Sequence, residues 1–194
     1  MKPLILASQS PRRIQILNMF NLPFEQAEHG FDERTIPWDG NAHEYTKKLA
    51  IEKGRNVALR FPDRIIISAD TIVVLNDSIL TKPANRDDAF AKLKSLSGTW
   101  NHVVTSIAVL HKTQIYSSSD ETRVYIQPLT DEQIHTYLSL DEWQDKAGGY
   151  AIQGHGSLLV QRIEGCYYNV IGLPVIPLSK LLKDVGIDLW HFLT

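Results

Sequence analysis

An aspartate in the middle of an apolar segment is the residue of this sequence best suited to chemistry. Asp70 stands within residues 65–75, where β-branched and aliphatic residues predict a strand that is buried on at least one face. An ionised carboxylate is costly to bury unless a cation, a metal ion or hydrogen bonds compensate it. Asp70 is therefore either satisfied by a structural partner or part of a functional site, and this segment alone does not decide between the two.

Two lysines are candidate ligands for phosphate. Lys53 falls near the centre of the apolar stripe of a helix expected over residues 42–59, so its side chain either snorkels out of the core or points into a cleft. Lys82 follows a short strand and precedes Pro83, which restricts its backbone. Most lysines are simply solvated, and a solvated surface position stays open for both.

Hydroxyl and guanidinium groups gather where the first strand gives way to a helix. Ser10 is suited to cap the helix and Pro11 to begin it, with Ser8 before them and Arg12 and Arg13 behind. Such a turn suits an anionic phosphate, because helix N–H groups, hydroxyls and arginines all donate hydrogen bonds. The alternative is a capped helix with surface arginines. The glycine-rich stretch of a P-loop is absent.

Carboxylates and an amide complete the list of candidates. Asp32 and Glu33, together with Asp70, could bind a divalent cation through the hard oxygen ligands that Mg²⁺ prefers, or they could be a solvated acidic pair. Gln153 lies in the glycine-rich stretch 145–154, where a backbone can approach a ligand closely and an amide can pair with a nucleobase edge. A tight structural turn explains that stretch equally well.

Alternating strand and helix patterns must position these side chains. Periodicity and turn signals predict helices over residues 11–20, 42–59, 86–96, 130–138 and 177–183, and strands over residues 4–7, 24–27, 65–75, 78–80, 102–110, 114–127 and 157–163. Asn76 and Asp77 suit a two-residue hairpin turn. The predicted class is α/β or α+β with a mixed sheet.

Composition narrows the range of partners. The chain has 194 residues with 43% hydrophobic and 22% charged, enough for one substantial core or two small lobes. A net charge of −2 predicts no general attraction to nucleic acid or to an anionic membrane. Cys166 is the single cysteine, so no intrachain disulfide forms. With no long apolar run, the expected location is the cytoplasm.

Taken together and in order, these segments closely resemble the Maf family of nucleoside triphosphate pyrophosphatases. The resemblance extends from Leu6 to Pro174, and no single motif carries it. The matching segments are 7–13 (ASQSPRR), 69–71 (ADT), 82–83 (KP), 96–98 (LSG), 102–105 (HVVT), 145–154 (DKAGGYAIQG) and 169–174 (NVIGLP). Ser106 and Cys166 stand where relatives often have Gly and Ser, and neither position matches a catalytic one.

The resemblance implies a fold and an activity. It implies an inosine-triphosphatase-like fold over residues 1–194, with a long mixed sheet flanked by helices and two lobes around a cleft. It also implies hydrolysis between the α and β phosphates, giving a nucleoside monophosphate and pyrophosphate, with a divalent cation (Mg²⁺ or Mn²⁺) as cofactor and a homodimer as the assembly. Arg12, Thr71 and Gln153 match the branch that is specific for dTTP and UTP.

The implied mechanism gives each residue a role. Asp70 orients or deprotonates the attacking water and, with Glu33, holds the metal. Arg12, Thr71 and Gln153 select the base. The phosphates are stabilised by Ser8, Arg13, Lys53 and Lys82. Two alternatives remain: a nucleotide-sensing regulator of cell division that acts through a protein partner, and a phosphatase that releases orthophosphate stepwise.

Overall fold

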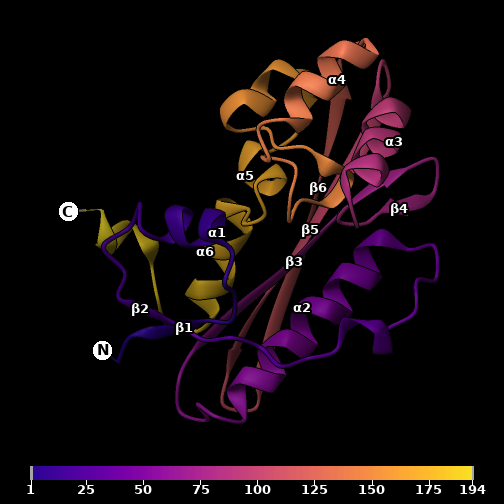
Figure 1. Ribbon diagram of the computed structural model, residues 1–194. Helices are drawn as coiled ribbons and strands as arrows, with labels where there is room; N and C mark the ends of the chain where they lie inside the picture. Colours follow the sequence, from indigo (N-terminus) through magenta and orange to yellow (C-terminus); the bar gives the residue numbers. More distant parts are fainter. Residues whose placement is uncertain (1, 194) are drawn as a thin grey trace. The chain divides into compact units, whose positions relative to one another are not determined.

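The strands form one mixed sheet of seven strands in residues 2–193, the part of the chain that the computed structural model describes (Figure 1). Their order is β2-β1-β3-β5-β6-β7, and β4 pairs with β3. Strand β1 runs parallel to both β2 and β3, whereas β4 and β7 are antiparallel to β3 and β6. The strands are β1 (Leu4–Leu6), β2 (Phe24–Gln26), β3 (Ile66–Leu75), β4 (Ser78–Leu80), β5 (Trp100–His111), β6 (Gln114–Ile126) and β7 (Val160–Glu164). The predicted class, a mixed α/β protein, is confirmed.

The chain divides into two compact units. Unit 1 comprises residues 1–70, 105–120 and 172–194, and unit 2 comprises residues 71–104 and 121–171. Strands β3, β5 and β6 contribute residues to both units, because three of the four boundaries fall within these strands and the fourth falls between α5 and α6. Asp70 is the last residue of unit 1 on β3 and Thr71 is the first of unit 2.

Unit 1 packs helix α2 (Ala42–Ala58) against the sheet. Figure 1 shows α2 alongside β3 and β5, and its Ala50 and Val57 share an apolar core with Ile5, Ile66 and Leu110. This unit also contains α1 (Pro11–Leu17), α6 (Val175–Asp184) and the 3₁₀ helices η1 (Glu33–Thr35) and η4 (Leu189–Phe192). The burial of α2 on the sheet fixes the direction in which its polar residues point.

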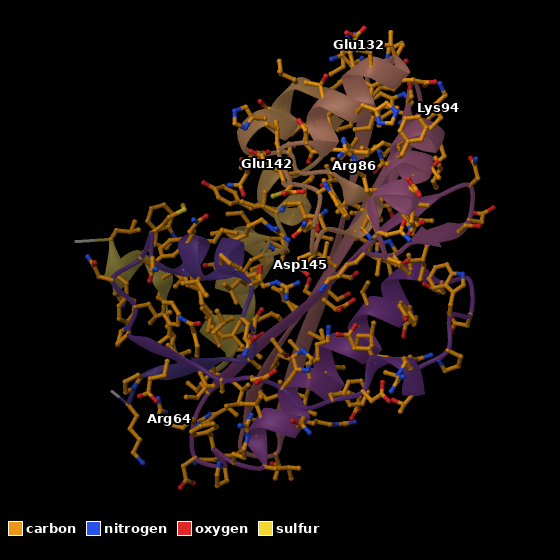
Figure 2. All side chains as sticks on the ribbon, in the orientation of Figure 1. Arg64, Arg86, Lys94, Glu132, Glu142 and Asp145 are labelled. Atoms are coloured by element: carbon orange, nitrogen blue, oxygen red, sulfur yellow. The ribbon has the colours of Figure 1, made fainter. Side chains whose placement is uncertain are left out.

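Unit 2 has its own core beneath α3 (Arg86–Leu96) and α4 (Asp131–Leu138). Leu93 of α3 and Ile134 of α4 are fully buried with residues of β3, β5 and β6. Charged side chains of these helices, including Arg86, Lys94 and Glu132, are labelled in Figure 2. Arg86 Nη2 donates to the carbonyl of His135 (3.2 Å) and joins the two helices. The remaining elements are η2 (Ala147–Gly149), η3 (Gly154–Leu158) and α5 (Tyr167–Val170).

Local chemistry explains several of the predicted boundaries. Asn76 and Asp77 both have positive φ (48° and 62°), as a two-residue hairpin of the twisted type requires. Thr130 and Gln133 form a capping box at the start of α4.

Two predicted boundaries were wrong. Helix α1 ends at Leu17 rather than Phe20, because the chain tightens into i→i+3 bonds from Met19 and Phe20. Strand β7 begins at Val160 rather than Ser157, since residues 154–158 form η3. A Cβ at Gly156 would lie 2.2 Å from the carbonyl oxygen of Ala151, so the packing of this turn depends on glycine. The short helices α5 and η4 were not predicted.

Among the described residues, no helix is both long and apolar enough to cross a bilayer.

Candidate functional site

Asp70 lies in the interior of β3 and is 6% exposed. Its Oδ1 accepts a hydrogen bond from Lys53 Nζ at 2.5 Å. Its Oδ2 is buried and has no hydrogen-bond partner. An unsatisfied buried acceptor carries the full desolvation penalty of that atom, so this oxygen is available to a group that the protein itself does not supply.

Lys53 is buried on α2 and reaches two carboxylates. Besides Asp70, its Nζ lies 2.9 Å from Glu33 Oε1. Of the two alternatives left open by the sequence, a lysine that snorkels into solvent is excluded, because Lys53 is only 5% exposed. Breaking such a buried pair would leave a charge uncompensated, so the two side chains constrain each other.

Glycine allows α2 to approach the sheet beside Lys53. A Cβ at Gly54 would lie 2.4 Å from Leu110 Cδ1 and 2.7 Å from Ser68 Oγ, closer than atoms can pack. Ser68 Oγ also donates to the carbonyl of Ala50 (2.6 Å), which ties β3 to α2. The close contact between helix and strand brings the lysine ammonium to the aspartate.

Glu33 begins the 3₁₀ helix η1, and its side chain is half-exposed. The neighbouring Asp32, which the sequence grouped with it, binds Arg34 instead: Arg34 Nε donates to Oδ1 and Nη2 to Oδ2, both at 2.9 Å. The same hydrogen bonds hold the pKa of Asp32 below its usual value. Asp32 also caps η1 through the amide of Arg34, so it positions the turn that carries Glu33.

Ser8 and Arg13 join the end of β1 to α1. Ser8 is buried, and its Oγ accepts from Arg13 Nη1 and from the amide of Ser10, both at 3.2 Å. Arg13 Nε donates to the carbonyl of Gly172 at 2.8 Å. Ser10 occupies the predicted N-cap position, but its side chain makes no capping bond. Burial lowers the pKa of Arg13 to about 10, against the opposing effect of Asp70.

Electrostatic effects link two further residues to this cluster, and sequence reasoning missed both. Burial, and then the charge of Lys53, lowers the pKa of His29, whose Nδ1 is buried without a hydrogen-bond partner. Burial, followed by the charges of Asp70 and Glu33, raises the pKa of Tyr45. His29 lies four residues before Glu33, and no spacing rule marks it.

A buried chain of hydroxyl groups fastens α2 to β5 and β6. Ser106 Oγ lies 2.7 Å from Thr46 Oγ1 and donates to Ser119 Oγ at 2.9 Å. Ser119 Oγ in turn lies 2.8 Å from His43 Nδ1. Ser106, a position where glycine is expected from the family resemblance, is therefore satisfied structurally within unit 1.

The residues assigned to base selection, together with Lys82, do not all lie in unit 1. Arg12 is half-buried on α1, beside Arg13, in unit 1. Thr71 follows Asp70 on β3, so their side chains point to opposite faces of the strand. Lys82 is exposed after β4, and Gln153 occupies the N-cap position of η3. Thr71, Lys82 and Gln153 belong to unit 2. The roles of all four residues stay predictions.

Glu142 anchors the turn that follows Gln153. Its Oε1 lies 2.7 Å from His155 Nδ1, and its Oε2 accepts from the amide of Gly156 at 3.3 Å. The hydrogen bond with His155 holds the pKa of Glu142 below its usual value. Figure 2 labels this side chain.

Around Lys53, the protein supplies only some of the oxygen ligands that a hard cation needs. No group of three or more His, Cys, Asp or Glu residues that could hold a metal occurs within residues 2–193. Asp70 and Glu33 nevertheless contact the same ammonium, and Asp70 Oδ2 has no partner. Mg²⁺ is commonly held by one or two carboxylates, with water and substrate phosphates completing its shell, so these residues fit such an ion.

Comparisons with known proteins find similarity over nearly the whole chain. The sequence profile described as Maf-like protein matches residues 3–185. A dTTP/UTP pyrophosphatase of Halalkalibacterium halodurans is 45% identical over 96% of this chain and 97% of its own length. Proteins of the same name from Pyrococcus furiosus (44% identical; 94% and 95% covered) and Caldicellulosiruptor saccharolyticus (42% identical; 97% and 98% covered) are also similar. Among solved structures, the Staphylococcus aureus Ham1 protein matches with a TM-score of 0.46 and 15% identity, over 64% of this chain and 72% of its own.

Proposed function

The chain belongs to the Maf-like protein family, and from this premise we propose that it hydrolyses dTTP and UTP between the α and β phosphates. Water adds to the α phosphorus, the bond to the bridging oxygen breaks, and the products are a nucleoside monophosphate and pyrophosphate. The names of relatives that are 42–45% identical over nearly the whole chain support this substrate class.

The state of the Asp70 carboxylate is the observation that carries the proposal. One oxygen is held by Lys53 and the other is buried without a partner. The unpartnered oxygen can accept a hydrogen bond from a water molecule, orient it, and take its proton as the new bond to phosphorus forms. Lys53 keeps the carboxylate in one orientation during that step.

Cationic groups next to this carboxylate suit a triphosphate. Lys53 and Arg13 can neutralise the phosphate oxygens and the charge that develops on the departing pyrophosphate. Arg13 is fixed by Ser8 and by the carbonyl of Gly172, so little reorganisation is needed when an anion binds. Ser8 contributes by holding Arg13, and we assign Lys82 to the same phosphates from the family resemblance.

A divalent cation, Mg²⁺ or Mn²⁺, is part of the proposal. Asp70 and Glu33 would hold it, and when bound it would neutralise phosphate charge and acidify a coordinated water. A homodimeric assembly and a cytoplasmic location likewise stay predictions.

Selection of the base is assigned to Arg12, Thr71 and Gln153. A buried amide or hydroxyl that pairs with the correct base is left unsatisfied by a wrong one, and this penalty discriminates strongly between nucleotides.

Product identification tests the proposed function. The protein is incubated with dTTP or UTP and Mg²⁺, and the phosphate products are identified by ³¹P NMR. Pyrophosphate together with the nucleoside monophosphate is the expected result. Stepwise orthophosphate would establish a phosphatase instead, and tight nucleotide binding without turnover would establish a nucleotide sensor.

A further inference from the structure

A six-residue segment follows β2, ends at the first residue of η1 and lies along α2; we call these residues, 28–33, the strap. Arg60 Nη2, just beyond the end of α2, donates to the carbonyl of Glu28. Asn56 Oδ1 accepts from the amide of Gly30 at 2.9 Å. Lys53 Nζ meets Glu33 at 2.9 Å. Successive contacts on the helix side are three and four residues apart, so they follow one face of α2 toward its centre.

Packing restrains the Glu33 side chain only weakly. The Glu33 side chain is 50% exposed, whereas that of its partner Lys53 is 7% exposed, so packing restrains the lysine far more than the glutamate. The strap leaves the sheet after Ala27, whose amide donates to the carbonyl of Leu6 at 3.0 Å. From that point, the contacts with α2 determine how close the turn η1 comes to Lys53.

The Gly30 amide is the middle attachment. Phe31 donates its amide to the carbonyl of His29 at 2.7 Å, which makes a tight turn centred on Gly30. The Gly30 N–H meets the side chain of Asn56 on α2, one helical turn after Lys53. A side-chain oxygen at position 56 thus anchors the backbone three residues before Glu33.

We propose that Asn56 is a positioning residue for Glu33, acting through the Gly30 amide. This inference rests on the proposed function, because the position of Glu33 matters only if that carboxylate serves the bound cation and triphosphate. The proposal assigns Asn56 no contact with either. What it supplies is an acceptor oxygen, which aspartate retains at the same place and alanine lacks.

Two measurements test the attachment. In metal-free protein, Asn56→Ala is expected to speed hydrogen exchange of the Gly30 amide roughly fivefold, the factor that corresponds to one lost hydrogen bond. With dTTP, Asn56→Ala is expected to lower kcat about tenfold and to raise the Mg²⁺ concentration needed for half-maximal rate. Asn56→Asp is expected to restore most of the protection and most of the rate.

Arg55→Ala is the matched control. Arg55 is the adjacent residue on α2, is exposed, and pairs with Glu52 at 2.5 Å within the helix. It is expected to leave both Gly30 exchange and kcat unchanged.

A double mutant separates positioning from general destabilisation. If Asn56 acts through Glu33, Asn56→Ala has no further effect on kcat once Glu33 is alanine. Multiplicative losses in the double mutant, or an Asn56→Ala protein with wild-type kcat and wild-type Gly30 exchange, would overturn the proposal. Absence of dTTP and UTP turnover in the wild type would instead refute the proposed function, and the exchange experiment would then still decide whether the strap is attached as described.

Discussion

At the scale of single residues, the pair of Asp70 and Lys53 is costly for a folding protein to keep. Their side chains are 8% and 7% exposed, so both charges have lost most of their water. A buried ion pair often stabilises a fold no more than an apolar pair of similar size would. The unpartnered Oδ2 of Asp70 adds to that cost. The proposed binding of a charged substrate would account for this cost.

Removing the lysine charge tests how strongly the pair is coupled. Lys53→Met keeps the length of the side chain but leaves Asp70 buried without its cation. We expect the free energy of unfolding to fall by about 3 kcal/mol, measured by urea denaturation at neutral pH.

Lys48→Met is the control for that change. Lys48 lies on the same helix and pairs with Asp39 at 3.3 Å, with side-chain exposures of 52% and 46%. Its loss is expected to cost less than about 1 kcal/mol. Equal costs for the two substitutions would show that burial contributes nothing to the coupling.

We expect the protonation of His29 to make the free energy of unfolding depend on pH. Burial and the Lys53 charge lower the pKa of His29 below its ordinary value of 6.5. Between the lowered pKa and 6.5, the unfolded chain binds the proton more readily than the folded one, so the free energy of unfolding falls as the pH drops through this range. Well above pH 6.5 neither state is protonated and this effect vanishes.

His29→Gln should remove that contribution. We expect Tm of the wild type to fall more than Tm of the variant between about pH 7.5 and about pH 5, measured by calorimetry without added metal. Parallel pH profiles for the two proteins would mean that protonation of His29 does not destabilise the folded protein.

At the scale of secondary structure, local chemistry determined which elements could be predicted. The turn at Asn76 and Asp77 was recognisable because these residue types tolerate positive φ. Helix α4 was recognisable from Thr130 and the acidic residues after it. The start of β7 was not, because the apolar residues Leu158 and Leu159 suit a strand as well as a 3₁₀ turn, and the packing of Gly156 against Ala151 decides between them.

The turn after Gln153 offers a prediction at this scale. Glu142 holds it through His155 and the amide of Gly156. Glu142→Ala should loosen the turn and reduce the preference for dTTP over dGTP, in kcat/KM, by about tenfold.

Glu164→Ala is the matched control in the same unit. Glu164 pairs with Arg123 and Arg162 on the exposed side of β6 and β7. Glu164→Ala should leave the preference for dTTP over dGTP unchanged. An equal loss of preference in both variants would show that Glu142 has no specific role in base selection.

At the scale of the whole molecule, the site joins residues that are far apart in sequence. Glu33, Lys53 and Asp70 come from η1, α2 and β3 and meet within unit 1. Ser8, which follows β1, contacts Arg13 of α1 in the same unit. Periodicity placed Lys53 on a buried stripe and Asp70 in a buried strand, but it could not pair them. The ordered set of motifs suggested the grouping. His29 and Asn56 escaped notice because their roles depend on the path of the strap along α2, which no local pattern encodes.

The most direct test of the account is the turnover of dTTP by Asp70→Asn, measured as pyrophosphate release in the presence of Mg²⁺. The substitution keeps the size of the side chain and removes its charge and its basicity. We expect kcat to fall by roughly 10²–10⁴-fold while circular dichroism shows a folded protein. Asp39→Asn, at an exposed position on the same unit, should leave the rate unchanged. Wild-type pyrophosphate release by a folded Asp70→Asn protein would contradict the account.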